Sequence, residues 1–333
     1  MTPFELGGQQ VAAGTAASID LEVSVLANST RMHLPVRVIH GAYAGPCFFM
    51  SGAIHGDEIQ GVEIIRQILQ RLDATQLHGT VLAVPIVNSF GFLTHARYLP
   101  DRRDLNRSFP GSDRGSLASQ VADLFFSKVV ARAQFGVDFH TAALHRTNLP
   151  QVRIAPDDTE LAQMADAFAP PVVMTAKLRD GSLRRAAGEA GIKVLLYEGG
   201  EALRFDETAI DVAVKGTLRL LKHLKMIALA PAPAGHVKVV HTSSSTWLRA
   251  PEGGILRSLR RAGDRVAKAE EIGVVTGPLG ETPVAVISED DGIIIGRTHL
   301  PIVNRGDALF HVARLKPKAK SLVQAVPDED EII

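Results

Sequence analysis

Short apolar segments alternate with segments of helical periodicity between residues 46 and 224 of this chain. The first apolar segment, residues 46–50, has the length of a buried strand, and the apolar residues that follow it recur at helical spacing. The same alternation then predicts strands at 80–85, 135–141, 172–174 and 192–197, and helices at 116–132, 158–168 and 206–224. It favours an α/β fold with a mostly parallel or mixed sheet and helices on both faces.

Two further segments extend this picture at the N-terminal side. Residues 20–26 and 33–39 alternate polar and apolar side chains around a break at 28–30, which predicts a hairpin that joins the main sheet. The segment from 88 to 111 is long for a connection in a compact domain, and such loops are usually functional.

The character of the chain changes after residues 230–235, an alternation of Ala and Pro that ends in Gly and indicates a linker. Short strands with turn glycines follow, in two similar halves that resemble the barrel-sandwich fold of biotinyl and lipoyl carrier domains. The carrier lysine between two methionines is missing, so a swinging-arm role is not expected. We expect a catalytic α/β domain at 1–229, a β-domain at 236–315 and a solvated tail at 316–333.

Composition restricts the class of protein. The chain has 36 basic and 36 acidic residues, so its net charge of zero gives no bulk attraction to nucleic acid or to an anionic membrane. The single cysteine, Cys47, lies in an apolar segment, which predicts inert packing and fits a reducing compartment. No signal-peptide pattern and no apolar run of about 20 residues is present in the sequence. We expect a cytoplasmic protein with a small-molecule substrate, and homo-oligomerisation is left open.

His55 and Glu58 lie three residues apart after the first expected strand, and this spacing at a helix start predicts that both side chains lie on the same side of the first helical turn. A neutral imidazole and a carboxylate at this spacing form half of a zinc site, and catalytic zinc usually takes a third protein ligand. His140 is the best candidate, because it ends another expected strand at the carboxyl edge of the sheet, where ligands bind in α/β folds. Other divalent ions also suit two histidines and one glutamate.

Most of the other histidines are expected to be surface residues or hydrogen-bonded structural residues. These are His33, His40, His78, His223, His236, His241, His299 and His311.

Four short motifs carry a family resemblance: His-Gly-Asp-Glu at 55–58, Arg-Asp-Leu-Asn-Arg-Ser-Phe-Pro-Gly at 103–111, Asp-Phe-His-Thr at 138–141 and Tyr-Glu-Gly-Gly at 197–200. In this order they resemble the aspartoacylase and succinylglutamate desuccinylase family, a branch of the zinc carboxypeptidase superfamily. The longer second motif is most similar to bacterial members that include N-acetyl-diaminobutyrate deacetylases. The resemblance implies a zinc-carboxypeptidase-like mixed sheet.

The resemblance also implies roles for the residues in these motifs. His55, Glu58 and His140 would hold one zinc ion per chain, and Glu198 would be the general base. Arg97 would stabilise the oxyanion of the tetrahedral intermediate. The segment between Arg97 and the second motif is longer than in aspartoacylase itself, so Arg102 and Arg103 remain alternatives for that role.

Substrate recognition is expected from a second group of residues. Asn106 and Arg107 match the pair that binds a carboxylate or polar group of the substrate, and Arg184 is a candidate for a second anchor. Arg146 and Asn148, just after the strand of His140, are further candidates to line the pocket. Glu201, near the expected base, is expected to be an exposed loop charge.

These residues favour a zinc-dependent amidohydrolase that cleaves a small N-acyl amino acid or a related acylated amine. Two alternatives stay open at this point. One is a metallocarboxypeptidase that acts on short peptides, and the other is a non-catalytic binding or scaffold protein built on a decayed form of the fold.

Overall fold

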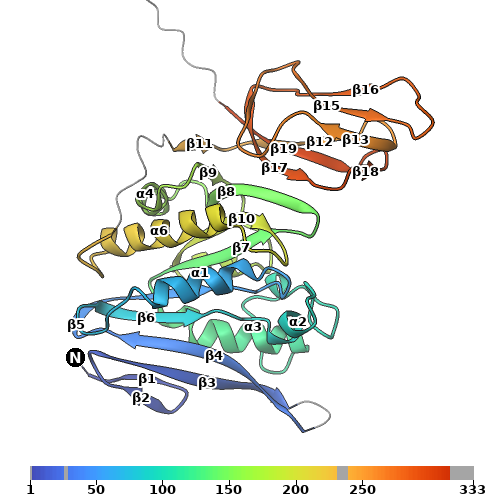
Figure 1. Ribbon diagram of the computed structural model, residues 1–333. Helices are drawn as coiled ribbons and strands as arrows, with labels where there is room; N and C mark the ends of the chain where they lie inside the picture. The colour runs from blue at the N-terminus through green and yellow to red at the C-terminus, as the bar shows by residue number, and fades with distance from the viewer. Residues whose placement is uncertain (1, 26–28, 231–238, 316–333) are drawn as a thin grey trace, which may run out of the picture.

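The computed structural model describes residues 2–25, 29–230 and 239–315 (Figure 1). As the alternation predicted, the chain forms a large mixed sheet with helices, in an α/β fold. The path of this sheet runs through β12 (Ser245–Arg249), β19 (Ala308–Arg314), β17 (Gly292–Thr298), β8 (Arg146–Ile154), β10 (Lys193–Glu201), β7 (Phe135–Ala142), β5 (Tyr43–Ser51), β6 (His78–Val84), β4 (Arg31–His40) and β3 (Thr15–Val25). The expected linker from residue 231 onward and the expected tail at 316–333 lie outside the described residues.

The parallel centre of the sheet positions the site. Its strands are β5 (Tyr43–Ser51), β6 (His78–Val84), β7 (Phe135–Ala142) and β10 (Lys193–Glu201). Helices cover both faces. One face packs against α1 (Gln60–Leu69), α4 (Thr159–Phe168) and α6 (Glu207–His223). The other packs against α3 (Leu117–Lys128) and α5 (Leu183–Glu189).

Local sequence explains where four of these helices begin. In each of α3, α4, α5 and α6, the side chain of the residue before the helix accepts a hydrogen bond from a backbone N–H of the first turn. These capping residues are, in the same order, Ser116, Asp158, Ser182 and Asp206. Such N-caps satisfy donors that would otherwise lack a partner. The predicted helices therefore begin within a residue or two of their expected starts.

The N-terminal hairpin is confirmed: β3 (Thr15–Val25) pairs antiparallel with β4 (Arg31–His40), which joins the main sheet through β6. A small sheet of β1 (Phe4–Leu6) and β2 (Gln9–Val11) precedes it. The long connection at 88–111 contains two short helical segments, α2 (Ser89–Leu93) and the 3₁₀ turn η1 (Leu105–Arg107). A second 3₁₀ turn, η2 (Val130–Arg132), follows α3.

One strand of the sheet was not expected from the sequence. β8 (Arg146–Ile154) pairs antiparallel with β10 and parallel with β9 (Val172–Thr175). Pro150 interrupts its apolar pattern, and several of its side chains are polar because they line a cavity rather than a core. The strand-like alternation is therefore weak in this segment.

The C-terminal strands form two sheets around their own apolar core. The first sheet continues the main one, because β17 (Gly292–Thr298) pairs with β8 and is followed by β19 (Ala308–Arg314) and β12 (Ser245–Arg249). The second sheet contains β13 (Gly254–Ser258), β15 (Glu271–Thr276), β16 (Val284–Ile287) and β18 (Ile302–Val303). Two short strands, β11 (Val240–Thr242) and β14 (Arg265–Val266), pair with β9 and β17 respectively.

Figure 1 shows this β-rich part at the end of the sheet opposite to the β3–β4 hairpin. Within the described ranges no helix has the length and apolar character needed to cross a membrane.

Candidate active site

His55 and Glu58 lie in the turn that follows β5. This turn is closed by a hydrogen bond of 3.0 Å from the Glu58 N–H to the carbonyl of His55. The expectation that both residues lie on the first helical turn is wrong, because α1 begins only at Gln60. The turn nevertheless brings Nδ1 of His55 to 2.7 Å from Oε1 of Glu58.

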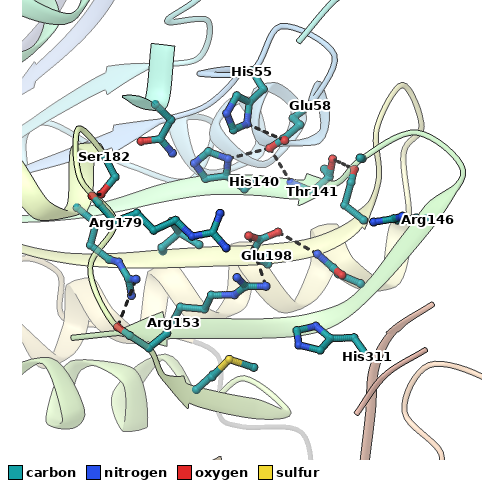
Figure 2. Close-up of a pocket in the computed structure, with 18 of the residues that line it drawn as sticks. His55, Glu58, His140, Thr141, Arg146, Arg153, Arg179, Ser182, Glu198 and His311 are labelled. Atoms are coloured by element: carbon teal, nitrogen blue, oxygen red, sulfur yellow. Dashed lines mark hydrogen bonds and ion pairs between the residues drawn. The ribbon is translucent and has the colours of Figure 1, made fainter. Parts of the chain in front are cut away.

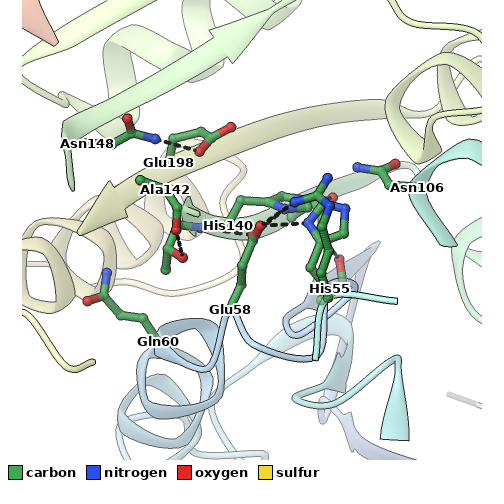
Figure 3. A network of polar contacts seen from close by, with 12 residues as sticks. His55, Glu58, Gln60, Asn106, His140, Ala142, Asn148 and Glu198 are labelled. Atoms are coloured by element: carbon green, nitrogen blue, oxygen red, sulfur yellow. Dashed lines mark hydrogen bonds and ion pairs between the residues drawn. The ribbon is translucent and has the colours of Figure 1, made fainter. Parts of the chain in front are cut away.

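His140, on β7, completes a cluster with these two residues (Figure 3). Its Nδ1 lies 2.8 Å from Oε2 of Glu58. One ligand atom from each of the three side chains lies within 4.8 Å of the others, and all three residues are buried. Two imidazoles and a carboxylate are a donor set typical of catalytic zinc, so the cluster fits such an ion.

Two aspartates orient the imidazoles of this cluster. Asp104 Oδ1 lies 3.1 Å from Nε2 of His55, and Asp138 Oδ2 lies 2.8 Å from Nε2 of His140. Ser51 holds Asp138 in turn, with a hydroxyl that donates to Oδ1 at 2.8 Å. Carboxylate partners of this kind fix the tautomer and the direction of metal-binding histidines.

Neither aspartate had an expected role, although Asp104 belongs to the motif at 103–111 and Asp138 to the motif at 138–141. A signal was present for Asp138, because residues two apart on a strand share a face and Asp138 therefore lies on the side of His140. No comparable local pattern connects Asp104 with His55, which lies 49 residues earlier in the chain.

The charges of the cluster stabilise its carboxylate. Burial acts to raise the pKa of Glu58, but the adjacent imidazoles of His55 and His140 hold this pKa well below its usual value. Burial acts to lower the pKa of His140, whereas Asp138 and Glu58 raise it well above the ordinary value for histidine. Glu58 is therefore ionised at neutral pH, which is the form that binds a metal ion.

Glu198, on β10, is the direct Cα partner of His140 in the parallel pairing of β10 with β7. Its Oε2 accepts a hydrogen bond of 2.9 Å from the side-chain amide of Asn148, and its Oε1 lies 3.7 Å from Nη2 of Arg153. Figure 2 shows Glu198 between His140 and Arg153. The strand register thus places a carboxylate beside the His–Glu–His cluster but outside it.

Arg97 is the arginine that contacts this cluster. Its Nη1 donates to Oε1 of Glu58 at 3.2 Å, and its Nη2 donates to Oδ2 of Asp104 at 3.0 Å. Arg102 and Arg103, the two alternatives from the sequence, are exposed and do not line the cavity.

The expected substrate residues lie around the same cavity. Asn106 is buried, and its Oδ1 accepts a hydrogen bond of 2.9 Å from the N–H of Leu183, which ties η1 to the start of α5. Arg107 is exposed, and its Nη1 donates a hydrogen bond to the carbonyl of Asn106. Arg184 is buried, and its Nη2 donates to the carbonyl of Lys177 at 3.2 Å.

The cavity has a volume of about 650 Å³, and its lining carries more cationic than anionic side chains. Among the described residues that line it, the carboxylates are Glu58 and Glu198. The cationic side chains that line it number seven: Arg97, Arg107, Arg146, Arg153, Lys177, Arg179 and Arg184. Such a surplus attracts anionic ligands.

The C-terminal strands supply one wall of this cavity through Ser245, Trp247 and His311. The rings of Trp247 and His311 are stacked, with centroids 4.6 Å apart, and the Arg146 guanidinium lies 5.3 Å from the Trp247 ring centre. His311 had been assigned only a surface or structural role. Its ring does bond Ser245, but it also borders the cavity, and burial together with Arg153 lowers its pKa to about 3.

Glu201 was expected to be an exposed loop charge, and this prediction is wrong. The side chain is buried at the end of β10, where Oε1 accepts from the N–H of His145 at 2.9 Å and Oε2 lies 3.0 Å from Nδ1 of His299. β10 continues past Glu198 through two glycines, so Glu201 still belongs to the sheet and is covered by neighbouring loops. It does not line the cavity.

The fold and the cavity together define an α/β protein whose reactive side chains gather at the carboxyl ends of its parallel strands. The sequence model of the succinylglutamate desuccinylase/aspartoacylase catalytic domain matches residues 44–224, and the chain belongs to this family.

Individual relatives agree with this membership. The chain is 27% identical over 295 residues to the N-alpha-acetyl-L-2,4-diaminobutyric acid deacetylase of Halomonas elongata, covering 85% of this chain and 86% of the relative. It is 24% identical over 209 residues to the succinylglutamate desuccinylase of Pseudomonas aeruginosa, covering 56% and 62% of the two chains. Both relatives are deacylases by name, which supports amide hydrolysis of acylated amino acids.

Solved structures share the fold over nearly the whole chain. A succinylglutamate desuccinylase/aspartoacylase from Rhodobacter sphaeroides has a TM-score of 0.80 at 25% identity, covering 91% of this chain and 96% of its own. The ectoine utilization protein EutE (DoeB) from Ruegeria pomeroyi, solved with bound product, has a TM-score of 0.81 at 22% identity, covering 94% and 99%.

Proposed function

We propose that this protein is a zinc-dependent deacylase that hydrolyses the amide bond of a small N-acyl amino acid. The main support is the convergence of His55, Glu58 and His140 within 4.8 Å, with Glu198 in direct register beside His140. The deacylase activities named for the relatives support the same reaction class.

In this proposal His55, Glu58 and His140 hold the zinc ion, and Asp104 and Asp138 orient the two histidines. When bound, zinc lowers the pKa of a water molecule and polarises the carbonyl of the substrate. Glu198 takes the proton from the attacking water and passes it to the leaving amine. The Asn148 amide holds Glu198 in place through a hydrogen bond of 2.9 Å to Oε2, and Nη2 of Arg153 lies 3.7 Å from Oε1.

The remaining roles belong to the polar residues of the cavity. The Arg97 guanidinium, held at the edge of the cluster by Asp104, donates to the oxygen on which negative charge develops. Asn106 and Arg107 bind a carboxylate or polar group of the substrate, and Arg184 is a second anchor, because a guanidinium fork matches a carboxylate.

A carboxypeptidase acting on short peptides would use the same groups. The wall formed by Ser245, Trp247 and His311 closes one side of the cavity and favours a small acylated amino acid. Comparing dipeptides with N-acyl amino acids separates these two enzymes. A non-catalytic scaffold would not need the complete cluster and its orienting aspartates.

We further propose the division into a catalytic domain at 1–229 and a barrel-sandwich β-domain at 236–315. The two-sheet arrangement of the C-terminal strands and their separate core support it. A cytoplasmic location accords with the single cysteine, Cys47, whose thiol is partly buried and has a pKa that burial raises to about 12.

Replacing the general base tests the proposed reaction. Glu198→Gln removes the proton acceptor but no metal ligand, so turnover of acylated amino acids is expected to be lost while zinc stays near one ion per chain. Glu207→Gln, at an exposed glutamate, is the matched control and keeps full activity. Full activity of Glu198→Gln would overturn the mechanism.

A further inference from the structure

We propose that a side cavity next to the active site binds the acyl chain of the substrate, so that the enzyme hydrolyses amino acids with apolar acyl groups longer than acetyl. This inference rests on the proposed deacylase function and specifies its substrate class. The side cavity has a volume of about 330 Å³ and lies between the turn that follows β7 and the connection from β17 to β18.

Apolar side chains form most of the lining of the side cavity. They are Ala143, Leu144, Leu300, Ile302, Val303 and Ala308. Leu144, Leu300 and Ile302 are 43%, 45% and 68% exposed, so a large part of their apolar surface faces solvent. Covering this surface with an alkyl chain is favourable, because it removes apolar area of both partners from water.

Two polar side chains of this lining, Thr298 and Asp307, are already hydrogen-bonded within the protein. The Thr298 hydroxyl accepts a hydrogen bond of 3.2 Å from the N–H of Leu300. Oδ2 of Asp307 accepts one of 2.7 Å from the N–H of Asn304. A polar ligand would have to compete with these partners, whereas an alkyl chain leaves them in place. The side cavity therefore suits an apolar group.

The side cavity adjoins the active-site cavity, because Ala143 and Arg146 line both. The active-site lining extends from His140 to Ala143, a distance of roughly 10 Å along an extended chain. Ala142 and Ala143 contribute only methyl groups to this path. Arg146 has its guanidinium 5.3 Å from the centre of the Trp247 ring, so its aliphatic stem is left to border the path. An acyl chain that starts at the metal cluster can therefore continue into the side cavity.

The proposed orientation of the substrate points its acyl group the same way. Figure 2 shows Ser182 on one side of His140, and Thr141 and Arg146 on the other. Arg184, the proposed second anchor for the amino acid, lies on the helix that Ser182 caps. A substrate held at Arg184 with its amide at the metal cluster therefore directs its acyl group toward Arg146 and the side cavity.

The two walls of the side cavity are fixed to each other. The N–H of His299 donates to the carbonyl of His145 at 2.7 Å. The buried Glu201 carboxylate accepts from the N–H of His145 at 2.9 Å and lies 3.0 Å from Nδ1 of His299. Thr298 and Arg146 are direct partners in the pairing of β17 with β8. A cavity with walls tied in this way needs little ordering when a ligand binds, which lowers the cost of binding.

Binding of free fatty acids tests the side cavity without turnover. Calorimetric titration of the whole chain with butanoate and with octanoate compares two acids that share a carboxylate and differ in alkyl length. Each methylene group that becomes buried contributes about fourfold in affinity, so octanoate should bind at least about tenfold more tightly than butanoate. Equal affinity for the two acids would overturn the acyl-chain site.

Two variants assign the effect to the side cavity. Leu144→Ser and Ile302→Ser each remove an apolar side chain, one from each wall, and each should reduce the advantage of octanoate about fivefold or more. Both side chains are exposed, so neither variant is expected to lose the fold. Leu279→Ser is the matched control, at a leucine that is 90% exposed on the connection between β15 and β16. An unchanged advantage of octanoate in both cavity variants would overturn the proposal.

Kinetics apply the test to the proposed reaction. With alanine as the amine, kcat/KM should be higher for octanoyl-alanine than for acetyl-alanine, and Ile302→Ser should lower the first value about fivefold while it leaves the second unchanged. A higher kcat/KM for acetyl-alanine in the wild type would overturn the substrate class. Full activity of Glu198→Gln would instead overturn the deacylase mechanism and leave the fatty-acid binding result standing.

Discussion

Nε2 of His55 lies 3.1 Å from Oδ1 of Asp104, whose second oxygen accepts a hydrogen bond of 3.0 Å from Arg97. One carboxylate thus connects a proposed metal ligand with the arginine proposed to stabilise the oxyanion. Asp104 also accepts from the N–H of Asn106 at 2.8 Å, so it orders the start of η1. Through these contacts Asp104 holds the start of the motif at 103–111 beside His55 and Arg97.

Replacing Asp104 by Asn should weaken zinc binding. The amide cannot offer His55 a charged acceptor, and loss of such an orienting partner typically costs about 10- to 100-fold in metal affinity. Competition with a chromogenic chelator measures this affinity. Asp113→Asn, at an exposed residue of the same loop, is the control, and equal zinc affinity in the two variants would contradict the role of Asp104.

Replacing Arg97 by Gln should reduce kcat more than it changes KM. The lost donor acts on charge that develops only in the transition state, and removal of one such donor costs roughly 100- to 1,000-fold in rate. Steady-state kinetics with an acylated amino acid measure the effect. Arg102→Gln serves as the comparison, because Arg102 is exposed, and a larger loss there would reassign the oxyanion role.

His311 should make stability depend on pH. Its folded-state pKa is lowered to about 3, so between roughly pH 3 and pH 6.5 the unfolded chain binds a proton that the folded chain does not. Stability contributed by neutral His311 is therefore complete above the unfolded pKa and is lost as the pH falls below it. At about pH 4 this loss amounts to roughly 3 kcal/mol.

Chemical denaturation of the wild type and of His311→Asn at about pH 7 and pH 4 measures this difference. The wild type should lose more stability than the variant on acidification. Parallel losses in the two proteins would show that His311 does not titrate as its surroundings imply.

Much of the site could be predicted because the carboxyl ends of parallel strands meet at one edge of a sheet. His55, Glu58 and His140 each follow or end a recognisable apolar strand, so local pattern brought these three together. Glu198 also lies on an apolar strand, but it was identified by the family resemblance. Arg153 escaped prediction because β8 has a polar, proline-interrupted pattern.

The contribution of the C-terminal strands could not be read from local sequence either. Trp247 and His311 reach the cavity only because β17 pairs with β8, more than a hundred residues earlier in the chain. Nothing in the sequence around a strand specifies a partner at that distance. The same holds for Glu201, whose burial depends on His145 and His299 from separate loops.

The central claim is that His55, Glu58 and His140 hold one zinc ion. Elemental mass spectrometry of the purified wild type, Glu198→Gln and His140→Ala tests it most directly. We predict close to one zinc per chain in the first two proteins and far less than one in His140→Ala, with all three folded by circular dichroism. Equal zinc content in the wild type and in folded His140→Ala would contradict the account.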